Sequence, residues 1–383
     1  MKSPIVVIDF GTSSARILVA EDDPRARVLA YESMPSLGVN HGVIVDLEKA
    51  AETIQHLISK VKKKIDIRFN RVYCTVSGDS ISSVNSHGVV KIRHQEVTPY
   101  DLDELSVTAQ ALALDNQVVV HMLPQSYKVD NQAGIIDPKG MFGVRLEGSF
   151  NLVLADQGAA QNMSRCLERV GLTCSGLIFP PIGLAAAVLT QDEKQQGVVV
   201  LDMGEGTTDC VVLYGGVVVF SASIPIGGAA VSHDIAHLLQ VNNDTAEKIK
   251  KLMGLADEEE AYMGVSSDKI REVIDARYAQ IIKLVDRCLV REGLKQKVNR
   301  GYVLCGGAMR YPGVSDIIES FLGKQSRQGS LVGASDSSMH QDWLSAAGLV
   351  YYIQQQAGSP IHSRNNPCRH AFKMIQRWLE VYF

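Results

Sequence analysis

Ile5-Val-Val-Ile-Asp9-Phe-Gly11-Thr-Ser-Ser14, near the start of the chain, has a counterpart half a chain later, Val198-Val-Val-Leu-Asp202-Met-Gly204-Glu-Gly206-Thr-Thr-Asp209. In both copies a short apolar run precedes an aspartate, a turn of small residues and a second apolar run. The first run is too short for a helix and fits a strand that is covered on both faces. The pattern therefore predicts a β-hairpin that the chain uses twice.

The residues of these two turns are suited to binding an anion. An aspartate at the end of a buried strand is costly unless a cation or several hydrogen-bond donors lie beside it. Glycines let backbone N–H groups approach a phosphate, and neighbouring Ser and Thr hydroxyls add donors. Two facing hairpins would grip a polyphosphate, with the carboxylates of Asp9 and Asp202 holding Mg²⁺ through water. One copy alone would more often be structural, so the prediction depends on the duplication.

Length and composition narrow the class of protein. The chain has 383 residues, which is natural for two domains, and its net charge of -4 with a pI of 6.2 argues against a general nucleic-acid binder. The seven cysteines form no CxxC pair and indicate reduced thiols in the cytosol. We expect no signal peptide, and no apolar run is long enough to span a bilayer. Any contact with a membrane should therefore be peripheral.

Strands that alternate with helices predict an α/β protein built from two domains. Between Ile81 and Ala160 the strands and one helix (Pro99 to Leu114) predict an inserted α+β subdomain, with a loop from Asp130 to Gly148. The polar stretch Gln191 to Gln196 resembles a hinge between the halves.

The two hairpins, together with Gly306-Gly307-Ala308-Met309-Arg310-Tyr311-Pro312, resemble the phosphate 1, phosphate 2 and adenosine motifs of the actin-like ATPase superfamily. Within it the chain is most similar to the bacterial cell-division protein family FtsA, nearly from end to end. Leu123 to Asp130, continued to Arg145, resembles the FtsA-specific subdomain 1C, and Glu272 to Tyr278 resembles the start of a long FtsA helix. The resemblance implies duplicated actin-like (ribonuclease H-like) α/β domains with an inserted 1C subdomain and a C-terminal amphipathic helix.

The resemblance also implies a division of the chain into subdomains. The expected order is 1–80 for the first part of 1A, 81–160 for 1C, 161–196 for the second part of 1A, 197–229 for the first part of 2A, 230–298 for 2B, 299–342 for the second part of 2A, 343–357 for a helix returning to 1A, 358–366 for a linker and 367–383 for the membrane-targeting helix.

The roles of single residues follow from the resemblance. Asp9 and Asp202 match the carboxylates that organise Mg²⁺. The expected nucleotide contacts come from the two phosphate loops, a Glu/Lys helix and the adenosine turn: Gly11, Thr12, Ser13, Ser14, Gly204, Gly206, Thr207, Thr208, Glu247, Lys250, Gly306, Gly307, Ala308 and Met309. Taken alone, the Glu/Lys run would more often be a solvated helix face.

Two departures bear on ATP turnover. Glu205 occupies the middle of a loop that normally reads Gly-Gly-Gly-Thr. Its side chain either faces solvent or repels the γ-phosphate and weakens turnover. Second, Ile178 to Gly183, where related ATPases place a Gln or Glu near the attacking water, offers no general base. We therefore expect at most weak ATPase activity.

The C-terminal segment has the pattern of an interfacial helix. Apolar residues recur at helical spacing on one face, with cations toward the other. The expected membrane contacts are Phe372, Lys373, Ile375, Arg377, Trp378, Leu379, Tyr382 and Phe383. The alternative is a terminal helix docked on the protein's own core, but the polar linker before it and the FtsA resemblance favour the membrane.

The resemblance implies an ATP-binding protein that polymerises with itself and tethers the tubulin-like division protein FtsZ, through the FtsZ C-terminal tail, to the inner face of the cytoplasmic membrane at the division site. Later division proteins would bind through 1C, membrane lipid through the C-terminal helix, and no nucleic acid is expected. The alternatives are a nucleotide-binding interaction module like the pilus-assembly protein PilM, and a kinase of the same superfamily. The tail argues against both, and the missing catalytic base argues against the kinase.

Overall fold

Two five-stranded sheets with the same strand order form the two halves of the chain. The structure is a computed structural model that describes residues 3–23, 27–111, 115–253, 262–332 and 341–357. The first sheet has the order β11-β6-β1-β2-β3, and the second, read in the same direction, has the order β16-β15-β12-β13-β14. The strands are β1 (Ile5–Phe10), β2 (Ser14–Ala20), β3 (Val28–Pro35), β6 (Arg71–Thr75), β11 (Thr173–Ile178), β12 (Val198–Met203), β13 (Thr208–Tyr214), β14 (Val217–Ile224), β15 (Tyr302–Cys305) and β16 (Ser326–Gln328).

Each sheet joins three antiparallel strands to two parallel ones, so the duplicated hairpins β1–β2 and β12–β13 occupy the same place in the two halves. The strand register shows that their charges differ. Asp9 stands opposite Arg16, whereas Asp202 stands opposite Asp209. The predicted duplication is confirmed as a duplication of fold, and its first copy carries its own counter-charge while its second does not.

The helices of the first half are α1 (Leu47–Lys64), α3 (Gln157–Arg169), α4 (Pro180–Val188) and α10 (Leu344–Ala357). Helix α1 begins at Asp46, whose carboxylate accepts hydrogen bonds from two backbone N–H groups of the first turn, and it ends in three lysines. Its buried face includes Ile54, Leu57 and Val61, at helical spacing. This face packs into the core of the first half.

Helix α4 lies between the two halves. Eight of its nine residues are buried, because it contacts α10 on one side and strands β12 and β13 of the second half on another. A helix that is apolar on all sides is expected in such a position. The crossing with α10 is close: a Cβ added to Gly348 would lie 2.8 Å from the carbonyl carbon of Gly183.

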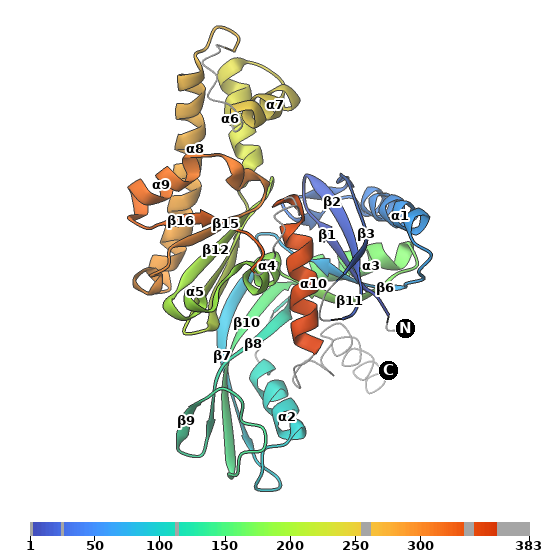
Figure 1. Cartoon of the computed structure of the whole chain (residues 1–383), viewed down its shortest axis with the longest axis vertical. Helices are drawn as coiled ribbons and strands as arrows, with labels where there is room; N and C mark the ends of the chain where they lie inside the picture. The colour runs from blue at the N-terminus through green and yellow to red at the C-terminus, as the bar shows by residue number, and fades with distance from the viewer. Residues whose placement is uncertain (1–2, 24–26, 112–114, 254–261, 333–340, 358–383) are drawn as a thin grey trace.

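The inserted subdomain forms its own four-stranded sheet with the order β7-β10-β8-β9, covered by one helix, and projects below the two halves in Figure 1. Its elements are β7 (Ser82–Lys91), α2 (Pro99–Gln110), β8 (Gln117–Val129), β9 (Gln132–Ile135) and β10 (Arg145–Asp156). A separate apolar core, with Leu105, Leu146 and Phe150 almost fully buried, holds the helix to the sheet.

The predicted loop from Asp130 to Gly148 starts where expected, because β8 ends at Val129, but it is wrong in its interior and at its end. Strand β9 lies inside it, and β10 begins at Arg145. The carboxylate of Asp130 accepts the backbone N–H groups of Val144 and Arg145, and its own N–H donates to the carbonyl of Arg145. This fixes the strand ends around the turn, so paired strands replace part of the loop that Gly and Pro content had suggested.

In Figure 1 the helices α6 (Gly228–Leu239) and α7 (Asn243–Met253) lie above the second sheet. Helix α8 (Ser267–Arg291) runs from their level down along the sheet, and α9 (Gly313–Leu322) lies beside it. The predicted hinge is a short helix, α5 (Gln191–Gln196), which starts in a capping box between Thr190 and Glu193. Arg327 of β16 donates to both carboxylate oxygens of Glu193, at 2.6 and 2.8 Å. The connection between the halves is therefore a helix tied to the second sheet.

Smaller elements complete the described chain: the hairpin strands β4 (Val39–Asn40) and β5 (Val43–Ile44), and the 3-10 helices η1 (Lys295–Lys297), η2 (Gly307–Arg310) and η3 (Gln341–Trp343). The predicted membrane contacts Phe372 to Phe383 lie outside the described residues. Within the described residues no helix is both long and apolar enough to cross a bilayer.

Candidate nucleotide-binding site

Three aspartates interact at the centre of the molecule, where the two duplicated hairpins face each other. Asp9 and Asp209 are buried, and Asp202 is largely enclosed. Burial, and after it the negative charges of Asp209 and Asp9, raises the pKa of Asp202 to about 8, with the Arg16 guanidinium opposing the rise. Burial also raises the pKa of Asp9, although the Arg16 guanidinium 3.7 Å away opposes this effect.

Asp209 is stabilised differently, by hydroxyl groups. Ser223 Oγ donates to one carboxylate oxygen at 2.5 Å and Ser77 Oγ to the other at 2.6 Å. Burial raises its pKa to about 6, against these hydroxyls and that of Thr207. Ser77 belongs to the first half and Ser223 to the second, so this carboxylate joins the halves.

Such a cluster of carboxylates suits a divalent cation. Raised pKa values mean that the folded protein holds negative charge in this place only at a cost, which a cation would remove. Among the described residues no group of three His, Cys, Asp or Glu side chains is arranged to hold a metal ion directly. That Asp9 and Asp202 hold Mg²⁺ through water, the arrangement that Mg²⁺ prefers, stays a prediction.

The two phosphate loops contact each other. A Cβ added to Gly206 would lie 2.6 Å from Thr12 Oγ1 and 2.9 Å from the Cα of His41, so only glycine fits there. The backbone N–H of Gly42 donates to Thr12 Oγ1 at 3.1 Å, and His41 Nδ1 lies 2.7 Å from the Gly206 carbonyl oxygen. The predicted facing of the two loops is thus seen in direct contacts.

The predicted adenosine residues gather beside the start of α6. Lys250 Nζ bonds Glu247 at 2.6 Å and donates to the Gly228 carbonyl at 2.9 Å, while Ser232 Oγ donates to Glu247. Burial raises the pKa of Glu247, but Lys250 and Ser232 outweigh it, and the net shift is downward. A Cβ on Gly228 would lie 3.1 Å from Ala308 Cβ and 3.3 Å from Lys250 Nζ. The Glu/Lys pair is therefore engaged beside the turn and is not only a solvated face.

The adenosine turn itself is fixed from three sides. Tyr278 donates a hydrogen bond to the Ala308 carbonyl, and its ring stacks on Tyr311 with centroids 5.3 Å apart. Gln328 Nε2 donates to the Met309 carbonyl at 2.8 Å. Gly306 has a φ of 86°, and it approaches strand β12 so closely that a Cβ on it would lie 2.6 Å from Asp202 Oδ1. The turn and the carboxylate cluster are thus neighbours.

Other predicted residues shape the loops. Gly11 donates its N–H to the Ser14 carbonyl, and Gly204 donates to the Thr207 carbonyl, so each loop closes on itself. The Ser13 carbonyl accepts the Ser36 N–H. Thr208 is fully buried and its hydroxyl donates to the Ile226 carbonyl at 2.7 Å, so it faces the second half rather than the opposite loop. A Cβ on Gly307 would meet nothing within 4 Å.

Glu205 is half-buried, and its carbonyl accepts the N–H of Ala229 at the first turn of α6. Its backbone thus connects the phosphate loop to the helix that borders the adenosine side. The hypothesis that its carboxylate weakens ATP turnover stays a prediction.

Three residues of this site were missed by the sequence analysis: Asp209, Ser77 and His41. Asp209 closes the quoted second motif, and the register of the predicted hairpin could have placed it beside Asp202. Ser77 and His41 carry no local signal, because their partners are 132 and 165 residues away in the sequence.

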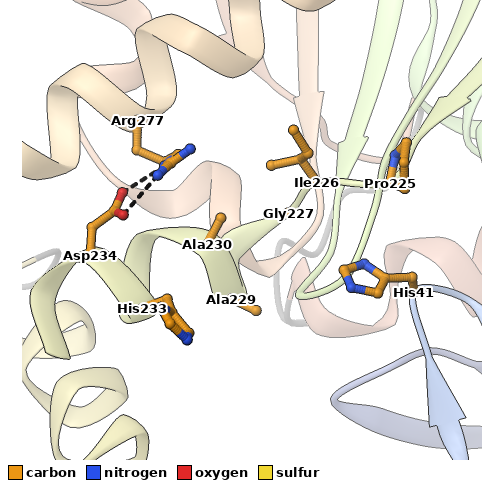
Figure 2. Close-up of a pocket in the computed structure, with 9 residues that line it drawn as sticks. All are labelled: His41, Pro225, Ile226, Gly227, Ala229, Ala230, His233, Asp234 and Arg277. Carbon is orange, nitrogen blue, oxygen red and sulfur yellow. Dashed lines mark hydrogen bonds and ion pairs between the residues drawn. The ribbon is translucent and has the colours of Figure 1, made fainter. Parts of the chain in front are cut away.

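A cavity of about 350 Å³ opens between His41 of the first half and the start of α6. Figure 2 shows the His41 ring on one side, with His233 and the Asp234–Arg277 ion pair on the other. Arg277 donates to both carboxylate oxygens of Asp234, at 2.6 and 2.7 Å. Pro225, Ile226, Gly227, Ala229 and Ala230 complete the lining.

Solved structures with similar folds include the PilM–PilN type IV pilus biogenesis complex (TM-score 0.66, 16% identity, 91% of this chain and 98% of that chain). MreB5 of Spiroplasma citri bound to ADP has a TM-score of 0.56 at 16% identity over 93% of this chain and 98% of that chain. The same protein has also been solved bound to AMPPNP, with a TM-score of 0.56 to this chain at 15% identity over the same shares of both chains. These similarities show that the fold is actin-like, as predicted.

Sequence comparisons identify the family. Residues 78–154 match the model described as "SHS2 domain inserted in FTSA", and residues 199–348 match "Cell division protein FtsA". The chain is 32% identical to cell division protein FtsA of Pseudomonas aeruginosa, over 99% of this chain and 98% of the relative. It is 31% identical to FtsA of Escherichia coli K12, over 91% and 90%. The chain therefore belongs to the FtsA family of cell-division proteins.

Proposed function

We propose that this protein binds Mg²⁺·ATP between its two halves, polymerises, and tethers the FtsZ ring to the inner face of the cytoplasmic membrane, where it helps to recruit later division proteins. The observation that carries the nucleotide part is the meeting of two phosphate loops over a cluster of carboxylates whose pKa values burial raises. ADP and AMPPNP in the two MreB5 structures support nucleotide binding by this fold.

Different residues of the chain would bind the metal ion, the phosphates and the adenosine of the ligand. Asp9 and Asp202 would hold Mg²⁺ through water, and Mg²⁺ would supply positive charge against the phosphates. The backbone of Gly11, Thr12 and Gly206 borders the phosphate side, and Glu247, Lys250 and Ala308 border the adenosine side. Because these groups come from both halves, a bound nucleotide would hold the halves at one angle, and that angle would set competence for polymerisation.

The sequence of Ile178 to Gly183 supports slow hydrolysis, because its side chains are apolar and offer no group that could orient a water molecule. We propose that ATP acts mainly as a structural ligand and that the inserted subdomain provides the surface for later division proteins. The identity of 32% to an FtsA, against 16% to PilM, favours this function over that of a pilus-assembly module.

Membrane tethering rests on the amphipathic sequence of residues 367–383. Its test is co-sedimentation with vesicles that contain anionic lipid, in Mg²⁺ and ATP, using the full chain and a chain that ends at residue 366. We expect the full chain to pellet and the shortened one to stay in the supernatant, because burial of Trp378 and its apolar neighbours drives binding. Equal pelleting of both would remove the tethering claim.

Isothermal titration calorimetry with Mg²⁺·ATP tests the nucleotide part separately on the same two chains. We expect equal affinity in both, since the site lies wholly within residues 9–309. Electron microscopy of the protein on lipid monolayers, with and without ATP, tests polymerisation; filaments should form with ATP and shorten or vanish without it.

A further inference from the structure

We infer that His41 is a positioning residue that orients the second phosphate loop toward the terminal phosphate of ATP, and that it does so only when the two halves are together. The inference rests on the proposed nucleotide site and adds a residue that discriminates ATP from ADP. It is carried by three features: the backbone at His41, the contact of its ring, and the contacts of its neighbour Gly42.

The backbone at His41 is unusual. Asn40 to Val43 form a two-residue turn between β4 and β5, with φ values of 46° at His41 and 76° at Gly42. A turn with both central residues left-handed prefers Asn-Gly at these positions, because Asn tolerates that conformation well. A histidine held there is uncommon, and such positions concentrate at functional sites.

The ring fixes the orientation of one peptide group in the opposite half. His41 Nδ1 lies 2.7 Å from the Gly206 carbonyl oxygen, and because a carbonyl only accepts hydrogen bonds, Nδ1 must donate. In a trans peptide the C=O and N–H groups point in opposite directions. Holding the Gly206 carbonyl toward His41 therefore turns the N–H of Thr207 to the other side of the loop. Backbone N–H groups fixed in this way are what phosphate loops use to bind their anion.

The same turn also contacts the first phosphate loop. Gly42 donates its N–H to Thr12 Oγ1 at 3.1 Å, and a Cβ on Gly42 would lie 3.1 Å from the N of Gly78 and the C of Ser77. Ser77 in turn donates to Asp209 of the second half. The His41–Gly42 turn thus links both loops at the point where the halves meet. Separating the halves would break the His41 bond and leave the second loop without this support.

The other side of the ring faces the cavity beside α6, whose opposite wall carries a second histidine, His233 (Figure 2). His233 is exposed and belongs to the second half only, so it cannot link the halves. It provides a matched control: the same kind of side chain, in the same cavity, without the contact to the loop.

The test replaces His41 by residues that distinguish the conformation of the turn from the hydrogen bond of the ring. His41→Asn keeps a side chain that suits the turn but is too short to reach Gly206, His41→Gln keeps a donor of longer reach, and His233→Asn is the control. Affinities for Mg²⁺·ATP and Mg²⁺·ADP are measured by isothermal titration calorimetry, and thermal unfolding reports the fold. We expect His41→Asn to weaken ATP binding about tenfold, as loss of one positioning hydrogen bond implies, with ADP binding changed less than twofold.

His41→Gln should recover most of the lost ATP affinity, His233→Asn should change neither affinity, and the melting temperature of His41→Asn should equal or exceed that of the wild type. Equal loss of ATP and ADP affinity in His41→Asn, or no loss of either, would overturn the inference while leaving the proposed site intact. If the wild-type protein binds neither nucleotide, the proposed function itself fails, so the two failures are distinguishable.

Discussion

Asp202→Asn should stabilise the protein in the absence of divalent cations and nucleotide. The pKa of Asp202 is raised to about 8 from an ordinary value of 3.8, first by burial and then by Asp209 and Asp9. A group whose pKa is raised on folding contributes its full stability below pH 3.8 and loses it as the pH rises to about 8. Asparagine never pays this cost, because it stays neutral at every pH.

The size of the gain follows from the pKa. Each pH unit above 3.8 costs about 1.4 kcal/mol until the folded group ionises, which gives roughly 4 kcal/mol at pH 7. Asp202 keeps some contact with solvent, and protonation of Asp209 relieves part of the repulsion, so we expect about half of this, ~2 kcal/mol. In a chain of 383 residues that corresponds to a rise of about 2.5 °C in melting temperature.

The assay is thermal unfolding by differential scanning fluorimetry between pH 5 and 8, in buffer with a chelator. The gain of Asp202→Asn over the wild type should grow with pH, and Mg²⁺·ATP should then stabilise the wild type but not the variant. The control is Asp101→Asn. The side chain of Asp101 is buried, but the hydrogen bonds that it accepts from Thr98 and Arg93 outweigh burial and lower its pKa, so this variant should lose stability. A gain for Asp202→Asn that is absent at pH 7, or that does not shrink toward pH 5, would refute the reasoning.

Two further substitutions test contacts of the second half. Lys250→Ala should weaken Mg²⁺·ATP binding about tenfold, because the Lys250 side chain is only 13% exposed and bonds both Glu247 and the Gly228 carbonyl. The control is Lys251→Ala, which should change the affinity less than twofold, because the Lys251 side chain is 68% exposed and lies 3.4 Å from Glu247. Isothermal titration calorimetry measures both affinities. Arg327→Ala should lower the free energy of unfolding by about 1–2 kcal/mol in a denaturant titration, since it removes the Arg327 donors of Glu193 Oε1 and of the Val188 carbonyl. Arg300→Ala, whose partner Asp192 is 4.0 Å away and exposed, should have almost no effect, and equal losses in the two Arg variants would contradict the argument.

The sequence was most informative where a pattern is local. Continuous apolar runs, each followed by an aspartate, predicted the two hairpins, because a strand that is buried on both faces has apolar residues at consecutive positions. Helix α1 carries local signals of the same kind, because its capping residue Asp46 and its three final lysines mark the two ends in the sequence. The same holds for the adenosine turn, where Gly306 needs a positive φ.

What the sequence could not show depends on contacts between distant segments. Asp130 fixes the return of the chain at Val144 and Arg145, and no short-range pattern marks a carboxylate that caps a strand 14 residues later. The hinge predicted at Gln191 to Gln196 is polar because its helix lies on the surface, and its ion pair with Arg327 spans 134 residues. His41 and Ser77 belong to the site only through their contacts with Gly206 and Asp209 of the other half.

Helix α10 fixes where the rest of the chain departs. It packs on α4, β1 and β2, its Tyr352 hydroxyl lies 3.1 Å from His121 of the inserted subdomain, and Gln354 near its end donates to the carbonyls of Glu21 and Asp23. His121 accepts the Phe179 N–H with its other nitrogen, so it is bonded on both sides within the core. Residue 357 is thus anchored in the reference frame of the first half and the inserted subdomain. If a bound nucleotide sets the angle between the halves, as proposed, the second half would turn relative to that anchor point, while the first half would stay fixed relative to a membrane bound through residues 367–383.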